Sequence, residues 1–214
     1  MKARRWIANL LLLGGVAAID VWIWSHAGAV IYQGWLDREF DRERQGALVG
    51  ESSTKGPEAI EAPGALSDNS PVGRLVIPRL HVRAMVREGV GEDTLSLALG
   101  HIPETALPGE KGNVGIAGHR DTLFRSLRNI RKNDLIVFET RNGTYEYRVE
   151  GMQIVKPAQV SVLKASGGHE LTLVTCYPFY YIGSAPDRFI VKARQVVQKE
   201  DARRPGGSGR SSQA

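Results

Sequence analysis

The sequence predicts a mainly β protein in which residues 72–198 form a closed or nearly closed β-barrel, preceded by an N-terminal transmembrane helix. Three observations lead to this prediction. Short β-prone runs bounded by Gly, Pro or Asn recur through residues 72–198, with few helical patterns between them. An apolar segment near the N-terminus has about the length that a helix needs to cross a bilayer. Hydrophobic residues make up 42% of the 214-residue chain, which is enough for one domain with a core.

The charge and the cysteine content exclude several classes of protein. The net charge is +5, but the 28 Lys and Arg residues are scattered among 23 Asp and Glu residues, and no basic stripe alternates with aromatic residues. No nucleic-acid partner is therefore expected. Because the chain has one cysteine, it has no internal disulfide, no CxxC redox pair and no cysteine-rich zinc site. The cysteine is either buried filler or a nucleophile.

Residues 6–28 are predicted to be an uncleaved membrane anchor. The run "WIANLLLLGGVAAIDVWIW" is interrupted by one Asn and one Asp, and basic residues precede it in residues 1–5. This charge distribution predicts a single pass, with residues 1–5 in the cytoplasm and the barrel outside it. A cleaved signal peptide is the alternative, because small residues follow the run at positions 27–29.

Two segments of low periodicity flank the predicted barrel. Residues 29–71 are predicted to hold a short charged helix beside the membrane and then a flexible linker, which is rich in Gly, Pro, Ser and acidic residues. Residues 199–214 have a similar composition and are predicted to be a disordered tail.

The strands are predicted in order along residues 72–198. The first is "GRLVIP", which ends at a proline, and "HVRAMVREG" follows with its apolar residues on one face. Further strands are "NVGIAG", "ELTLVTC" and "RFIVKARQVV". In "DLIVFETRNGTYEYRVEG", the Asn142-Gly143 pair between two β-prone runs predicts a hairpin. Short helices are predicted around residues 92–99 and 123–130.

The cysteine, Cys176, ends the predicted strand "ELTLVTC". Pro178 cannot donate to a sheet ladder, so strand pairing is expected to stop there on at least one side. Alternation places Cys176 on the face opposite Leu173 and Thr175. A thiol at this position is reachable by a substrate while its backbone is held in the sheet. The position also fits a structural thiol, because free cysteine is among the most buried residue types.

A cysteine nucleophile needs a base and a group that stabilises an oxyanion. Of the five histidines, His119 follows an apolar strand that ends in small residues, where Gly118 leaves room for a substrate backbone. Arg188 begins the strand after the cysteine strand, so pairing of the two strands would bring its guanidinium to Cys176. Asp121 either orients His119 or caps the next turn. The histidines form no HxH or HxxxH pair and no acidic loop fits calcium, so no metal is predicted.

These residues resemble the signature of the sortase family. "TLVTC" is similar to the TLxTC motif, with "GHR" upstream and Arg188 downstream. The stretches "NVGIAGHRDTLFRSL" and "LTLVTCYPFYYIGSAPDRFIVKA" resemble class D sortases, and the resemblance covers residues 72–196. It implies an eight-stranded β-barrel and a membrane-bound cysteine transpeptidase that uses no cofactor.

The resemblance also implies roles and partners. It makes Cys176 the nucleophile, His119 the acid and base, and Arg188 the group that steadies substrate and oxyanion. From their positions, Thr175 and Gly118 are expected to touch the substrate; the alternative for Thr175 is that it serves only as a β-prone residue of the strand. The implied partners are secreted proteins with an LPxTG-like C-terminal sorting signal and an amine acceptor from a peptidoglycan precursor or a pilin. The alternatives are a cell-envelope cysteine peptidase without transfer activity and a non-catalytic, membrane-tethered barrel that binds ligands.

Overall fold

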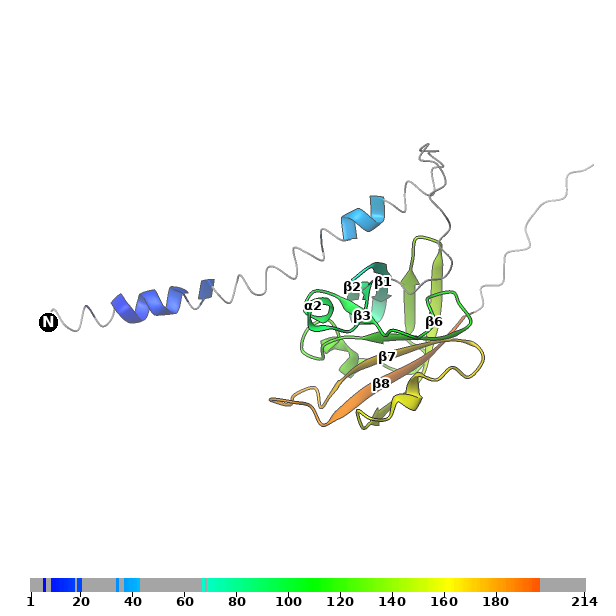
Figure 1. Cartoon of the computed structure of the whole chain (residues 1–214). Coiled ribbons are helices and arrows are strands. Elements are labelled where there is room, and N and C mark those ends of the chain that lie inside the picture. Colours follow the sequence, from blue (N-terminus) through cyan, green and yellow to red (C-terminus); the bar gives the residue numbers. More distant parts are fainter. Residues whose placement is uncertain are drawn as a thin grey trace, which may run out of the picture.

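Eight strands close into a barrel in the order β1-β2-β3-β4-β7-β8-β6-β5, and β5 pairs with β1 to complete the circle (Figure 1). This computed structural model describes residues 6, 9–17, 19–20, 34, 37–42, 67 and 69–196. The strands are β1 (Pro71–Ile77), β2 (Val82–Glu88), β3 (Leu99–His101), β4 (Gly112–Ala117), β5 (Leu135–Glu139), β6 (Thr144–Val155), β7 (His169–Tyr177) and β8 (Asp187–Gln195). The predicted closed, eight-stranded barrel is confirmed.

Two of the strand pairs are parallel, β2 with β3 and β4 with β7. The pair formed by β7 and β8 is antiparallel. Consequently the last residues of β4, the last residues of β7 and the first residues of β8 meet at one end of the barrel. Figure 1 shows β7 and β8 as neighbours, with the loop that joins them projecting from the lower part of the barrel.

Alternating apolar side chains fill the interior of the barrel. In β2, Val82, Ala84 and Val86 belong to the buried core, and in β7 both Leu171 and Leu173 are fully buried. The alternation predicted from the sequence is therefore confirmed for both strands. Because side chains alternate with a period of two, a shift of either strand by one residue would turn these side chains away from the core.

Strands β5 and β6 form the predicted hairpin. The backbone N–H of Thr140 donates to the carbonyl of Gly143 at 2.8 Å, so the turn contains the predicted Asn142-Gly143 pair. β6 continues to Val155, further than the alternating sequence pattern predicts. β6 pairs with β8 from Tyr147 to Val155, with a register shift just after Val149.

The helices that flank the strands are short. The α-helix α2 covers Glu92–Leu95, and it is shorter than predicted because the chain enters β3 at Leu99. The segment predicted as a helix over residues 123–130 is the 3-10 helix η2 (Arg125–Asn129). Two further 3-10 helices are η1 (Pro78–Leu80) and η3 (Val160–Leu163).

Part of the predicted membrane anchor lies among the described residues, as exposed helical residues 9–17. Within the described part of the chain, no helix combines the length and the apolar character needed to cross a bilayer. Residues 1–5, 21–28 and 199–214 lie outside the described residues, as does most of the predicted linker. The anchor, the linker and the tail therefore stay predictions.

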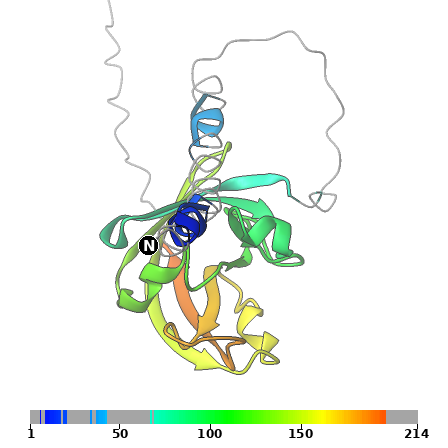
Figure 2. The same ribbon diagram turned by 90° about the vertical axis from the view of Figure 1, so that its left-hand side faces the viewer.

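A short helix at residues 37–42 packs on the barrel. Its Phe40 side chain is 4% exposed, and the Arg74 guanidinium lies 5.1 Å from the centroid of the Phe40 ring. Arg74 also donates to the carboxylates of Asp37 and Asp41, at 3.2 and 2.8 Å. In both views this light-blue helix lies above the barrel, whereas the orange loop between β7 and β8 lies at the bottom (Figures 1 and 2). The helix therefore docks on the wall of the barrel that lies across from β7 and β8.

Candidate active site

Cys176 is the penultimate residue of β7 and lies at the end of the barrel from which the β7–β8 loop projects. The thiol is free and half-buried. The flanking Thr175 is buried, as is Leu173, so alternation puts Cys176 on the outer face of the barrel. Pairing with β8 ends at Tyr177, directly before Pro178, as the sequence predicts. The sulfur is thus held by a rigid strand and lies next to a loop.

Arg188 lies directly opposite Cys176 in the antiparallel pair of β7 and β8. Residues opposite each other in such a pair project to the same face, with Cβ atoms about 5 Å apart. The guanidinium Nη1 donates to the backbone carbonyls of Ala185 and Asp187, at 3.2 and 3.0 Å. The Asp187 carboxylate pairs with Lys156 at 2.7 Å, and no ion pair to Arg188 is found among the described residues. The positive charge of Arg188 therefore remains available to a ligand.

The parallel pair of β4 and β7 brings His119 to the same end of the barrel. The paired residues end with Ala117 opposite Val174, and the N–H of Gly118 donates to the carbonyl of Val174 at 3.1 Å. The half-buried His119 follows the last residue of β4 by two positions, so it lies at the end of the barrel where β7 carries Cys176. Since β4, β7 and β8 are consecutive around the barrel, the three predicted catalytic residues lie at the same end of three neighbouring strands.

Thr175 and Gly118 bind each other. The Thr175 hydroxyl donates to the carbonyl of Gly118 at 2.7 Å, and Thr175 is 2% exposed. A Cβ atom added to Gly118 would lie 2.6 Å from a methyl carbon of Leu99 and 2.7 Å from the Phe124 ring. Core packing therefore requires a glycine here, and the hydroxyl contact fixes the end of β4 to β7. The contact of both residues with a substrate stays a prediction.

A buried polar network holds the loop between β6 and β7 against the outer face of the barrel. The ammonium of Lys192 donates to the carbonyl of Val162 in η3 and, at 2.9 Å, to the hydroxyl of Thr172. That hydroxyl donates to the side-chain oxygen of Asn113 at 2.7 Å. Burial lowers the pKa of Lys192. The network therefore holds η3 against the outer face of β4, β7 and β8.

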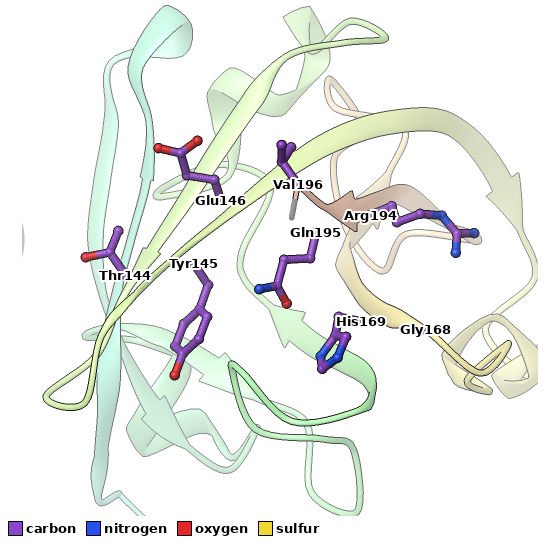
Figure 3. A pocket seen from close by; sticks show the side chains of 8 residues that line it. All are labelled: Thr144, Tyr145, Glu146, Gly168, His169, Arg194, Gln195 and Val196. Atoms are coloured by element: carbon purple, nitrogen blue, oxygen red, sulfur yellow. The ribbon is translucent and has the colours of Figure 1, made fainter. Parts of the chain in front are cut away.

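A cavity of about 560 Å³ lies at the opposite end of β7 (Figure 3). It is lined by the first residues of β6 and the last residues of β8, and the side chains of Tyr145, His169 and Gln195 border it. His169 begins β7 whereas Cys176 lies near its end, so a rise of about 3.3 Å per residue separates them by roughly 20 Å. The cavity is therefore separate from the site of the three predicted catalytic residues.

No group of three or more His, Cys, Asp or Glu side chains within the described residues could hold a metal ion. The expected absence of a metal and of a cofactor stays a prediction. Asp121 is exposed, and the described contacts include no hydrogen bond between it and His119. Both alternatives for Asp121 therefore also stay predictions.

The fold and the site together define a β-barrel protein with a cysteine, a histidine and an arginine at one end of three adjacent strands. The family model for the Sortase domain matches residues 75–196. The chain therefore belongs to the sortase family, whose members are cysteine transpeptidases.

Two curated relatives show how far the similarity extends. Sortase D of Bacillus subtilis (strain 168) is 34% identical over 126 residues, which cover 58% of this chain and 64% of that protein. Sortase A of Bacillus anthracis is 31% identical over 134 residues, which cover 60% of this chain and 63% of that protein. The chain thus spans less than two thirds of the length of these relatives. The predicted resemblance to class D is confirmed by the first match.

Solved structures share the barrel. Sortase A from Corynebacterium diphtheriae matches with a TM-score of 0.58 and 27% identity, over 63% of this chain and 64% of that one. A sortase from Actinomyces oris matches with a TM-score of 0.57 and 30% identity, over 64% and 87%. A Clostridium perfringens Sortase D5 transpeptidase matches with a TM-score of 0.59 over 77% and 96%. Its identity of 24% supports the fold alone.

Sequence reasoning missed the residues that hold the two loops beside the site. Lys192 and Asn113 hold the loop between β6 and β7, and Arg120 holds the loop between β7 and β8. The one signal available for Arg120 is its position directly after His119 in "GHR". Lys192 gives no such signal, because a lysine within a strand reads as a solvated side chain.

Proposed function

We propose that this chain is a membrane-anchored cysteine transpeptidase that cleaves an LPxTG-like sorting signal near the C-terminus of secreted proteins. The observation that supports this most strongly is that Cys176, His119 and Arg188 all lie at the same end of three adjacent strands. Membership of the sortase family supports the class of reaction.

In the first half of the proposed reaction, the Cys176 thiolate attacks the carbonyl carbon of the threonine in the sorting signal. A C–S bond forms and the carbonyl oxygen becomes an oxyanion. When this intermediate collapses, the C–N bond to the following glycine breaks, and His119 gives a proton to the departing amine. The product is a thioester between the substrate and Cys176.

In the second half, an acceptor amine attacks the thioester carbonyl. His119 takes a proton from this amine, a new C–N bond forms, and the C–S bond breaks to release Cys176. The acceptor is an amine of a peptidoglycan precursor or of a pilin lysine. Water in place of the amine gives hydrolysis, which is the side reaction when no acceptor arrives.

Arg188 stabilises the oxyanion in both halves of this proposal. It faces the same side of the sheet as Cys176, and its guanidinium keeps several N–H donors beyond the two bonds that it makes to backbone carbonyls. Donors fixed in advance at the position of developing charge are usually the largest single contribution to acyl-transfer catalysis. A strand that is paired along its length supplies such a fixed position.

The proposed location is the cell membrane, with a cytoplasmic N-terminus, a single membrane pass and the barrel on the outer side. The apolar run within residues 6–28 and the basic residues before it support this orientation. The partners are secreted proteins that carry the sorting signal, together with the amine acceptor.

The decisive experiment incubates the full chain, in detergent micelles, with a fluorogenic LPxTG peptide in the presence and absence of an amine acceptor. Cleavage and an amine-dependent ligation product, detected by mass spectrometry, are expected. Cleavage without ligation would favour the cysteine peptidase, and no reaction would favour the ligand-binding barrel.

The matched control is Cys176→Ala, which removes one sulfur atom from a half-buried position. It is expected to lower the rate by at least about 10³-fold. The thermal unfolding curve should stay unchanged, because the thiol makes no disulfide. Turnover that survives this substitution would show that the assigned nucleophile is wrong.

A further inference from the structure

We propose that Arg120 is a positioning residue for the transfer reaction, because its guanidinium holds the loop at residues 178–186 in place between Cys176 and Arg188. The inference rests on the proposed function. Arg120 itself touches neither the thiol nor the reacting carbonyl in this proposal, and it acts through the loop that joins the nucleophile strand to the arginine strand.

Arg120 binds three backbone carbonyls of the loop. Its Nη1 donates to the carbonyl of Pro178 at 3.0 Å, and its Nη2 donates to the carbonyls of Tyr181 and Gly183 at 2.7 and 3.0 Å. The guanidinium carbon also lies 5.9 Å from the centroid of the Tyr181 ring. The three bonded carbonyls are distributed over most of the loop, so one side chain fixes both its start and its middle.

The loop has little else to hold its backbone. In the described part of the chain, no backbone–backbone hydrogen bond outside the strands involves residues 178–186. The tip projects into solvent, since Ile182 is 98% exposed and Tyr180 is 79% exposed. One further attachment is the Phe179 ring, which packs edge-on against the Phe189 ring at 5.3 Å. Segments with few buried contacts and few backbone bonds open at low free-energy cost, so the loop depends strongly on Arg120.

The position of Arg120 connects all three catalytic residues of the proposal. It follows His119 directly in the chain, and the loop that it binds begins just after Cys176 and ends just before Arg188. The bonds between Arg188 and the carbonyls of Ala185 and Asp187 also depend on how the end of this loop lies. Movement of the loop would therefore shift the oxyanion donor relative to the sulfur.

Arginine is required at position 120 because the three carbonyls are bound by N–H donors in a fixed arrangement. A planar guanidinium presents five N–H donors in a fixed fork, whereas a lysine ammonium is a compact charge on a flexible chain. Lysine keeps the positive charge at position 120, but it cannot bind three separated carbonyls in the same way. Arg120→Lys therefore separates the effect of loop geometry from the effect of charge.

The test compares Arg120→Lys and Arg120→Ala with the wild-type chain in the LPxTG transfer assay. Since a misplacement of about 1 Å can cost about 100-fold in rate, kcat is expected to fall about 10- to 100-fold in both variants, with little change in KM. Hydrogen exchange of residues 178–186, followed by mass spectrometry, is expected to become about tenfold faster.

The matched control is Arg128→Ala. Arg128 is exposed and stacks on Tyr180 of the same loop at 5.4 Å, with no hydrogen bond to a loop carbonyl in the described contacts. We expect kcat and the exchange of residues 178–186 to stay at wild-type values in this variant. A loss equal to that of Arg120→Lys would show that any arginine against the loop has the same effect, and the proposal would fail.

A double variant tests whether Arg120 acts through Arg188. If it does, Arg120→Lys should cost less than about threefold in kcat once Arg188→Lys is already present, because coupled residues are not additive. A full 10- to 100-fold further loss would contradict the positioning role.

The outcomes also separate this proposal from the proposed function. If the wild-type chain turns over the peptide and Arg120→Lys matches it in both kcat and hydrogen exchange, the positioning proposal fails while the proposed function stands. If the wild-type chain is inactive, the proposed function fails, and unchanged exchange in Arg120→Lys would independently overturn the loop contact.

Discussion

Two arginines on opposite sides of the barrel each bind three oxygen-bearing groups of other segments, but the charges of these groups differ. Arg74 in β1 donates to the carboxylates of Asp37, Asp41 and Glu139, at 3.2, 2.8 and 2.6 Å. Arg120 donates to three neutral backbone carbonyls of the β7–β8 loop. The first contact joins opposite charges, whereas the second leaves the charge of the arginine without a carboxylate in the described contacts.

The difference indicates that the two contacts serve different purposes. Arg74 is 3% exposed. Burial by itself would lower its pKa, but hydrogen bonds to Asp41, Glu139 and Asp37 raise the pKa of Arg74 above its usual value. Such a buried cation needs its carboxylates for stability. Arg120 is half-buried, and its contact fixes the geometry of a loop beside the proposed catalytic residues. Stability is therefore expected to depend on Arg74 and the rate of transfer on Arg120.

The largest effect on stability is expected from Arg74→Met. The free energy of unfolding should fall by about 3 kcal/mol, the lower end of the range for breaking a buried ion pair. The lower end applies because the side chains of Asp37 and Asp41 keep partial contact with water. Urea unfolding measures the loss, and kcat/KM should stay at the wild-type value in the folded variant. A fall in kcat/KM as large as that of Arg120→Lys would remove the contrast between the two arginines.

A smaller loss of stability is expected from Asp134→Asn. The partner of Asp134 is Arg79, which binds both a carboxylate and a backbone carbonyl. Its guanidinium donates to both carboxylate oxygens of Asp134 at 2.5 Å and to the carbonyl of Asn129 at 2.7 Å. The hydrogen bond from Arg79 lowers the pKa of Asp134. A carboxylate with a lowered pKa stabilises the folded chain above its unfolded pKa, and this stabilisation disappears as pH falls through the folded pKa.

The melting temperatures of the wild-type chain and Asp134→Asn should therefore differ at pH 7 and converge in acid, below about pH 4. A difference that stays constant across this range would mean that the charge of Asp134 is irrelevant. The contact between Arg79 and the carbonyl of Asn129 involves no carboxylate, so it is expected to be the same in both proteins at every pH.

The smallest effect is expected from Arg83→Gln, at the edge of the Arg74 contact. Arg83 pairs with Asp37 at 2.9 Å, and its side chain is 49% exposed. Exposed ion pairs contribute about 0.2–1 kcal/mol to the free energy of unfolding. In 1 M salt the Debye length falls to about 3 Å, so the attraction within such a pair is largely screened. The destabilisation should accordingly vanish in 1 M NaCl. Exchange of the loop at residues 178–186 should not respond to salt, and a salt response there would contradict the geometric account of Arg120.

The parts of the fold that follow local rules could be predicted from the sequence. The alternation in β2 and β7 and the Asn142-Gly143 turn depend on neighbouring residues, and the structure has each of them as predicted. The strand β3 was missed, because Leu99–His101 is too short to show a period and is defined by its partners β2 and β4. The end of α2 was misjudged for the same reason.

The candidate site could be predicted in part. Cys176, His119 and Arg188 stand at strand ends, which a sequence pattern can locate. The contacts of Arg74 could not be predicted, since an arginine within a strand reads as exposed and its three carboxylates lie far away in the chain. The contacts of Arg120 could not be predicted either. Its partners are backbone carbonyls, which every residue type has, so the sequence of the loop does not indicate them.

The docked helix at residues 37–42 determines which part of the chain can set the distance between the barrel and a membrane. Residues 42 and 69 both belong to segments that contact the barrel, so the chain between them starts and finishes on the same rigid body. Lengthening that stretch would therefore enlarge a side loop without raising the barrel. With the anchor proposed above, the distance of the catalytic residues from the lipid surface is limited by the residues between the apolar run and Asp37, together with the width of the barrel itself.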